Sequence, residues 1–194
     1  MLDHLKNYRI ILASKSPRRQ QLLRGMDIDF EVLVKDSDES FPDKMPTTEV
    51  APFLSRKKSM AFADHELPSG FLLITADTVV IIDDQILNKP ADRDDARRML
   101  SLLQGRQHTV VTGFTLRSQH NIFTDKDLSL VDFVPLRDEE INYYVSCYEP
   151  YDKAGAYGIQ EWIGYVGIAS VQGSFFNVMG LPTHKLYQAL KNFP

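Results

Sequence analysis

Residues 8–25 read YRIILASKSPRRQQLLRG, and this stretch decides the fold class. It opens with an apolar run that is typical of a buried strand. Ser16 and Pro17 then predict a helix start, with the serine as N-cap and the proline at the first helical position. The helix should reach about Arg24 and close at Gly25. A strand that turns directly into a helix favours an α/β fold.

Strand and helix patterns continue to alternate along the rest of the chain. Strands are predicted over residues 30–34, 71–75, 79–82 with 86–87 as a hairpin, 109–116 and 128–133, with further aromatic strands within 152–180. Helices are predicted over residues 48–64, from the cap Asp92 to Gly105, from Asp138 to about Cys147, and from Pro182 onward. The strand 71–75 is the most apolar and should be central, with Asp77 at its carboxyl end.

Composition limits the classes of protein. The chain has 194 residues, 43% of them hydrophobic, which suits one core, and we expect a single domain over residues 1–194 with two lobes and no linker. The lone Cys147 predicts a reducing, cytoplasmic setting, and neither a signal peptide nor a membrane span is expected. The net charge of −4 argues against nucleic acid as a partner. A bound anion would need a local basic pocket.

Such a pocket is predicted at the first helix. Arg18 and Arg19 lie in its first turn, where the helix dipole already favours an anion, so two cations there suit a phosphate ligand. Ser14 and Ser16 add hydroxyl donors. This segment alone is equally consistent with a plain Ser16 cap and two arginines that face solvent.

Acidic residues supply the second chemical signal. Asp77 would be costly to bury unless it binds a cation, accepts hydrogen bonds or moves a proton, although an Asp that caps a turn is commoner. The loop that holds Asp36, Asp38 and Glu39 could provide oxygen ligands for Mg²⁺ or Mn²⁺, although most acidic loops are solvated surface. Each of these signals is weak alone.

Two other classes of phosphate enzyme receive less support. The chain has neither a GxxxxGK[ST] loop nor a GxGxxG after a strand. Asp36-Ser37-Asp38 after a strand is similar to the nucleophile loop of haloacid-dehalogenase-type phosphatases, but the Ser-Pro-Arg-Arg turn has no role in that scheme.

Several motifs in order along nearly the whole chain resemble the Maf family of nucleoside triphosphate pyrophosphatases. They are LASKSPRRQQLL (12–23), DSDES (36–40), LSRKKSMA (54–61), ITADTVV (74–80), NKP (88–90), GRQHTVVTG (105–113), DKAGAYGIQ (152–160) and NVMGLP (177–182). The resemblance implies a two-lobed fold similar to the Maf and ITPase enzymes, with a mixed, twisted sheet flanked by helices and an active-site cleft between the lobes. It also implies a divalent metal, Mg²⁺ or Mn²⁺, an assembly that is often a homodimer, and hydrolysis of a nucleoside triphosphate to monophosphate and pyrophosphate.

The branch that acts on dTTP and UTP is the most similar one. Arg18, Thr78 and Gln160 match it, whereas the 7-methyl-GTP branch typically has an aromatic residue, Gln and Glu at these sites. Glu161-Trp162-Ile163 departs from the glycine-led turn that usually follows this position in the family.

The resemblance also implies the roles of individual residues. Asp77 is the expected general base and Glu39 its helper, both also as metal ligands, with Lys89 as a further catalytic residue. The expected substrate-binding residues are Ser14, Ser16, Arg18, Arg19, Lys58, Thr78 and Gln160. Alternatives to the pyrophosphatase are a nucleotide-binding inhibitor of septum formation that acts through partners, a 7-methyl-GTP enzyme, and a phosphomonoesterase that depends on Asp36.

Overall fold

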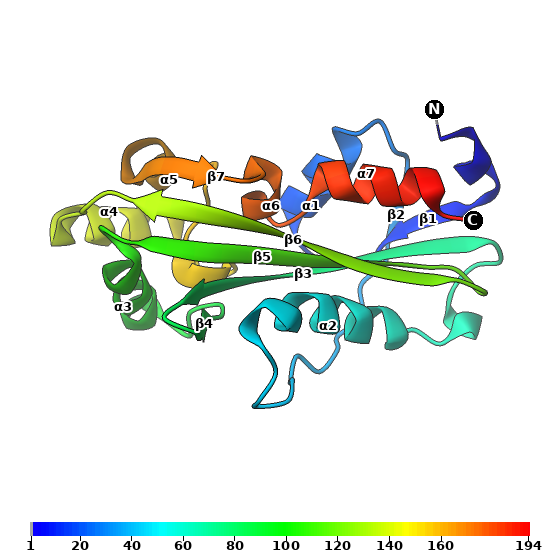
Figure 1. The fold of residues 1–194 in the computed structure, drawn as a ribbon, viewed down its shortest axis with the longest axis horizontal. Coiled ribbons are helices and arrows are strands. Elements are labelled where there is room, and N and C mark those ends of the chain that lie inside the picture. The colour runs from blue at the N-terminus through cyan, green and yellow to red at the C-terminus, as the bar shows by residue number, and fades with distance from the viewer. Residues whose placement is uncertain (1) are drawn as a thin grey trace. The chain divides into compact units, whose positions relative to one another are not determined.

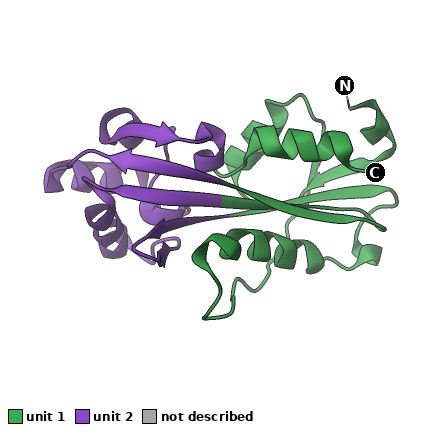
Figure 2. Ribbon diagram, in the orientation of Figure 1, with its two compact units in different colours: residues 1–77, 112–127, 180–194 green, residues 78–111, 128–179 purple. Residues whose placement is uncertain are grey.

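The computed structural model describes residues 2–194, and the chain forms two compact units (Figure 2). The first unit comprises Met1–Asp77, Thr112–Asp127 and Gly180–Pro194, and the second comprises Thr78–Val111 and Leu128–Met179. Each unit is therefore built from segments that are distant in sequence.

Within residues 2–194, seven strands form one mixed, twisted sheet in the order β2-β1-β3-β5-β6-β7, with β4 paired to β3 (Figure 1). The strands are β1 (Arg9–Leu12), β2 (Glu31–Val32), β3 (Phe71–Ile82), β4 (Gln85–Leu87), β5 (Gln107–Arg117), β6 (Ile122–Phe133) and β7 (Ile168–Gln172). β1 pairs in parallel with β2 and β3, whereas the β3–β4 and β6–β7 pairs are antiparallel. The predicted α/β class with a mixed sheet is confirmed.

The helices lie on the faces of this sheet. They are α1 (Pro17–Arg24), α2 (Thr47–Met60), α3 (Arg93–Leu103), α4 (Asp138–Tyr148), α5 (Trp162–Gly167), α6 (Phe175–Met179) and α7 (Thr183–Asn192), with the short 3-10 helices η1 (Asp3–Asn7), η2 (Asp64–Glu66) and η3 (Ala154–Ala156). In the first unit, α2 covers one side of the strands, and α1 and α7 cover the other (Figure 1). Over residues 2–194, none of these helices has the length and apolarity to cross a membrane.

β3 is the central strand, as predicted, but it is longer than the sequence indicated. Leu72, Leu73 and Ile74 are fully buried, and the strand continues without a break through Asp77 to Ile82. The prediction that the strand ends at Thr75 was therefore wrong. Asp77 lies inside the strand, three residues beyond the last pair with β1, which is Leu12↔Ile74. The carboxylate thus still lies where the neighbouring parallel strand has ended.

Two other predicted segments differ from the structure. The strand expected over residues 30–34 is reduced to Glu31–Val32. The aromatic strands expected within 152–180 were wrong, because this region contains a single strand, Ile168–Gln172, without an aromatic residue. Trp162, Tyr165, Phe175 and Phe176 lie in the short helices α5 and α6 instead.

Helix α2 packs very closely on the sheet within the first unit. An ideal Cβ on Gly113 of β5 would lie 2.2 Å from the backbone nitrogen of Pro52 on α2, so only glycine fits. The buried Thr75 hydroxyl donates to the Ser55 carbonyl at 2.7 Å, and the Ser55 hydroxyl lies 2.9 Å from that of Thr115. These contacts fix the last turns of α2 beside β3 and β5, which brings Lys58 within reach of β3.

Candidate active site

The turn between β1 and α1 is held by its two serines. The Ser14 hydroxyl accepts a hydrogen bond from the Ser16 backbone N–H at 3.2 Å, and the Ser16 hydroxyl accepts from the Arg19 N–H at 3.5 Å. Pro17 occupies the first helical position, where its missing N–H costs nothing. Ser16 is therefore an N-cap, as predicted, and the positive end of the helix dipole at this turn favours an anion.

Arg19 points back into the first unit. Its Nε donates to the Gly180 carbonyl at 2.7 Å and its Nη1 donates to the Ala76 carbonyl at 2.8 Å. Burial lowers the pKa of the guanidinium, while the nearby charges of Asp77 and Glu39 raise it. Arg19 thus ties α1 to the strand residue next to Asp77, whereas Arg18 is half-buried in the same turn.

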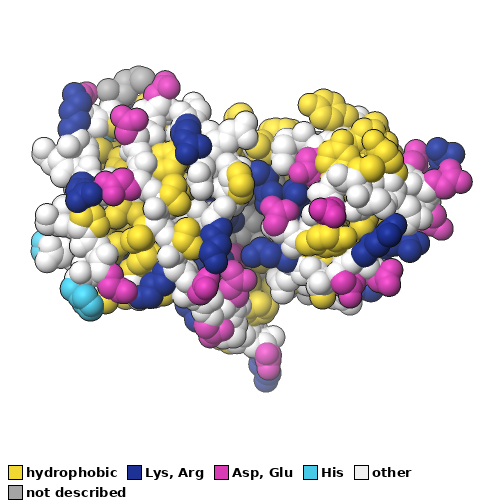
Figure 3. Space-filling view, turned by 180° about the vertical axis from the view of Figure 1, so that it is seen from behind, with side chains coloured by type: hydrophobic (Ala, Val, Ile, Leu, Met, Phe, Trp, Pro, Cys, Tyr) yellow, Lys and Arg dark blue, Asp and Glu magenta, His cyan; other side chains and the backbone are white. Residues whose placement is uncertain are grey.

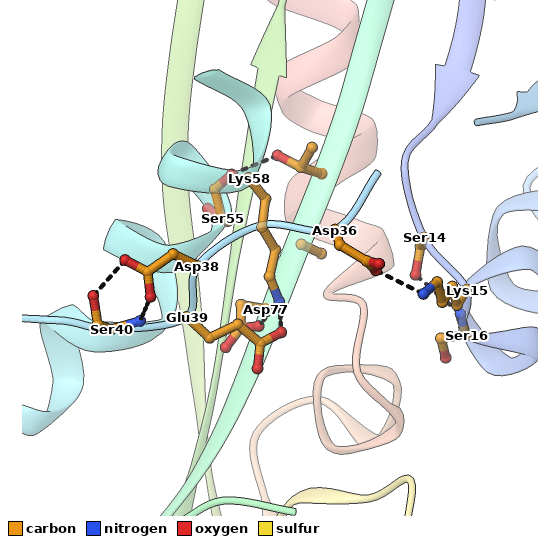
Figure 4. Close-up of polar contacts among 12 residues, drawn as sticks. Ser14, Lys15, Ser16, Asp36, Asp38, Glu39, Ser40, Ser55, Lys58 and Asp77 are labelled. Atoms are coloured by element: carbon orange, nitrogen blue, oxygen red, sulfur yellow. Dashed lines mark hydrogen bonds and ion pairs between the residues drawn. The ribbon is translucent and has the colours of Figure 1, made fainter. Parts of the chain in front are cut away.

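Lys58, Glu39 and Asp77 form an ionic cluster beside this turn (Figure 4). The Lys58 ammonium lies 2.9 Å from Glu39 Oε1 and donates a short hydrogen bond to Asp77 Oδ1. The Lys58 and Asp77 side chains are only 18% and 13% exposed, whereas that of Glu39 is 52% exposed. Two carboxylates from different segments therefore converge on one ammonium group, which is itself largely buried.

The remaining acids of the 36–40 loop have different partners. Asp36 pairs with Lys15 at 2.7 Å and its side chain is 93% exposed. Lys57 donates to Asp38 at 2.7 Å and to the Ser40 carbonyl at 2.7 Å. These contacts, with the Ser40 hydroxyl and N–H, hold the pKa of Asp38 far below its usual range. An exposed Asp36 paired with a lysine does not fit a buried nucleophile, which argues against the dehalogenase-type reaction.

Thr78, Lys89 and Gln160 belong to the second unit. Thr78 is half-buried on β3, and Lys89 is exposed in the loop after β4. Gln160 is half-buried, and its Oε1 atom is buried without a hydrogen-bond partner among the described residues. The other seven predicted site residues belong to the first unit, and they are Ser14, Ser16, Arg18, Arg19, Glu39, Lys58 and Asp77.

The sequence prediction missed several supporting residues. Lys57 lies next to Lys58 in the quoted motif but received no role, although an acidic loop that precedes two adjacent helix lysines is a readable signal. The backbone carbonyls of Ala76 and Gly180 could not be inferred, because Gly180 lies 161 positions from Arg19. Lys153 lies within the quoted 152–160 motif, but its contact with Glu161 depends on tertiary structure.

Glu39 and Asp77 are the residues that fit a divalent cation. Among residues 2–194, no three His, Cys, Asp or Glu side chains gather as a metal cage. Mg²⁺ is commonly bound by one or two carboxylates with substrate phosphates and waters, so a pair that already converges on one cationic group suits it. In that arrangement the nucleotide would supply the other ligands.

Comparison with known proteins identifies the family. The family model described as "Maf-like protein" matches residues 9–193. The chain belongs to the Maf family. A Maf relative from Parabacteroides distasonis named dTTP/UTP pyrophosphatase is 50% identical over all of both chains. One from Porphyromonas gingivalis with the same name is 52% identical over all of this chain and 98% of its own.

A solved structure also resembles this Maf chain at low identity. The Ham1 protein of Staphylococcus aureus aligns with a TM-score of 0.47 and 15% identity, over 64% of this chain and 71% of the Ham1 chain.

Proposed function

We propose that this Maf protein hydrolyses dTTP and UTP to the nucleoside monophosphate and pyrophosphate. The observation that carries the proposal is the Asp77–Lys58–Glu39 cluster, which lies in the same unit as the serine- and arginine-bearing turn that opens α1. Full-length relatives at 50% and 52% identity named dTTP/UTP pyrophosphatase support the substrate class. A house-cleaning role in a cytoplasmic nucleotide pool follows from that activity.

The triphosphate would be held at the first turn of α1. Its oxygens accept hydrogen bonds from the Ser14 and Ser16 hydroxyls and from the Arg18 guanidinium, at the positive end of the helix dipole. Arg19 donates to two backbone carbonyls, so its main part is to fix the helix against β3. Lys58 and Lys89 add positive charge for the phosphates, as the family motifs imply.

Asp77 is the general base in this scheme. It accepts a proton from a water molecule whose oxygen attacks the α-phosphorus, the new P–O bond forms, and the bond to the bridging oxygen breaks as pyrophosphate leaves. A divalent cation held by Asp77 and Glu39 would supply neutralisation of the phosphate charge. Alignment and charge stabilisation dominate such reactions, so no covalent intermediate is needed.

Lys58 has a distinct part before substrate binds. Its ammonium neutralises both carboxylates, which would otherwise repel each other, and Asp77 in particular is largely buried. A divalent cation that arrives with the triphosphate would replace Lys58 as the positive partner of the two carboxylates. The Lys58 ammonium could then bind the phosphate oxygens.

A panel of nucleoside triphosphates with identified products tests the proposal. The panel contains UTP, dTTP, CTP, GTP and 7-methyl-GTP, each with Mg²⁺ or Mn²⁺. The proposal predicts pyrophosphate and monophosphate from UTP and dTTP. Tight binding without turnover would indicate a regulator instead, release of orthophosphate would indicate a phosphomonoesterase, and a preference for 7-methyl-GTP would contradict the substrate assignment.

A further inference from the structure

Glu161 is a largely buried carboxylate of the second unit. Its side chain is 19% exposed and lies 3.1 Å from the ammonium of Lys153, whose own side chain is 9% exposed. The hydroxyl of the fully buried Tyr144 donates a short hydrogen bond to the other carboxylate oxygen. A buried carboxylate is costly unless paired in this way, so the network is built rather than incidental.

The same network closes the turn from Gly158 to Glu161. The Tyr144 hydroxyl accepts a hydrogen bond from the Gly158 N–H at 3.0 Å, and the Glu161 N–H donates to the Gly158 carbonyl at 3.0 Å. One tyrosine therefore holds both ends of the turn, one through the backbone and one through the Glu161 side chain.

Gln160 lies on this turn and is packed into it. A Cβ on Gly158 would lie 2.9 Å from Glu161 Cδ and 3.1 Å from Gln160 Nε2, so both side chains lie directly over the glycine. The Gln160 Oε1 atom is buried and has no partner among residues 2–194. An unpaired buried amide oxygen costs about 1–3 kcal/mol, and a ligand donor that bonds to it removes that cost.

The chemistry of that acceptor selects among bases. Uracil and thymine carry an N3–H donor, whereas the N3 of cytosine is an acceptor. An amide oxygen held in one orientation accepts from the former and leaves the latter unpaired, and a buried mismatch of this kind discriminates strongly.

We propose that Glu161 is a positioning residue that sets base preference, because it holds the Gly158–Glu161 turn so that the Gln160 amide oxygen accepts from the N3–H of uracil or thymine. This inference rests on the proposed pyrophosphatase function. Asp152 also pairs with Lys153, at 2.7 Å, so Lys153 keeps a charge partner when Glu161 is replaced. A Glu161 variant is therefore expected to fold.

The test measures kcat and KM for UTP, dTTP and CTP in four variants. E161A should raise KM for UTP about tenfold with kcat little changed, and lower the UTP-over-CTP preference about tenfold, the effect of one lost buried hydrogen bond. E161Q retains an acceptor for Tyr144 and should restore most of that preference. Y144F removes only the hydroxyl and should shift preference in the same direction as E161A. E139A, on an exposed glutamate of α4, is the control and should match wild type.

The double variant Y144F/E161A should shift the preference no further than the larger single change, because both remove the same contact. Unchanged UTP-over-CTP preference in E161A would overturn the inference. It would also be overturned if E161A lost kcat equally on every nucleotide and its melting temperature fell in parallel, because that result indicates a general loss of stability. If wild-type protein releases no pyrophosphate from any pyrimidine triphosphate, the proposed function fails together with the inference. If wild type is active and E161A keeps its preference, the inference alone fails.

Discussion

Lys58 on α2 forms an ion pair with Asp77 on β3 through a short hydrogen bond in a place where both side chains are largely buried. Glu39 reaches the same ammonium from the 36–40 loop, at 2.9 Å. The relationship explains how a carboxylate can lie inside the central strand. It also places a proton acceptor beside a turn suited to phosphates.

Asp77→Asn should separate binding from turnover. The amide keeps the shape of the side chain but cannot accept a proton from water, so kcat should fall by about 10²- to 10⁴-fold. Affinity for a non-hydrolysable α,β-methylene analogue should stay within a few-fold of wild type by calorimetry. Turnover close to wild type would remove Asp77 from the role of base.

Lys58→Met should free the two carboxylates for a cation. Without the ammonium between them, Glu39 and Asp77 should bind Mn²⁺ more tightly in the absence of nucleotide, which electron paramagnetic resonance measures directly. Lys57→Met is the matched control, because Lys57 pairs with Asp38 rather than Asp77. Equal Mn²⁺ affinity in both variants and wild type would argue against Glu39 and Asp77 as the metal ligands. EDTA should abolish turnover of the wild-type enzyme.

Neighbouring arginines should have different effects. Arg19→Ala leaves the Ala76 and Gly180 carbonyls without their donor, so the free energy of unfolding should fall by about 1–3 kcal/mol in a urea titration. Arg18→Ala should raise KM, because the proposed role of the Arg18 guanidinium is to bind the phosphates. An Arg19→Ala protein as stable as wild type would contradict the anchoring role.

Two glycines give a matched test of the packing. Gly113→Ala places a Cβ 2.2 Å from the Pro52 nitrogen, so α2 must move, at a cost of about 3 kcal/mol or more in unfolding free energy. At Gly25 the nearest atoms would be 3.5 Å away and φ is −65°, so Gly25→Ala should stabilise by about 0.4–1 kcal/mol. Similar melting temperatures for the two variants would show that α2 is not packed as described. Gly113→Ala should also lower activity, since Lys58 lies on that helix.

His108 should make stability depend on pH. Its Nε2 lies 2.7 Å from the Tyr157 hydroxyl, and burial lowers its pKa from 6.5 to about 4. Between these values the unfolded chain binds the proton and the folded chain does not, so this contribution is complete above pH 6.5 and is lost as pH falls toward 4. The loss amounts to roughly 3 kcal/mol. His108→Gln should flatten that part of the urea-unfolding profile, and an unchanged slope would refute the assignment.

Helix caps and turns are the parts of the fold that adjacent residues in the sequence predicted correctly. Ser16, Pro17 and Gly25 define α1, which runs from Pro17 to Arg24 as expected. Asp83 and Asp84 both have positive φ, at 49° and 58°, in the predicted hairpin between β3 and β4. Turns and caps depend on a few adjacent residues, so the sequence alone can place them.

Contacts between residues that are distant in sequence explain the predictions that were wrong. Asp77 suggested a strand end because a charge inside a buried strand is unfavourable, but Lys58 compensates it from 19 positions away. The helices of residues 162–179 contain aromatic residues that favour strands, and packing overrides that preference. The motif order predicted the candidate site residues, whereas the contacts of Arg19 and Glu161 required the structure.

Hydrolysis of UTP in ¹⁸O-labelled water tests the central claim most directly. If Asp77 activates water for attack at the α-phosphorus, mass spectrometry should find one ¹⁸O atom in each UMP and none in the pyrophosphate. Label in pyrophosphate, or orthophosphate as the first product, would contradict the account.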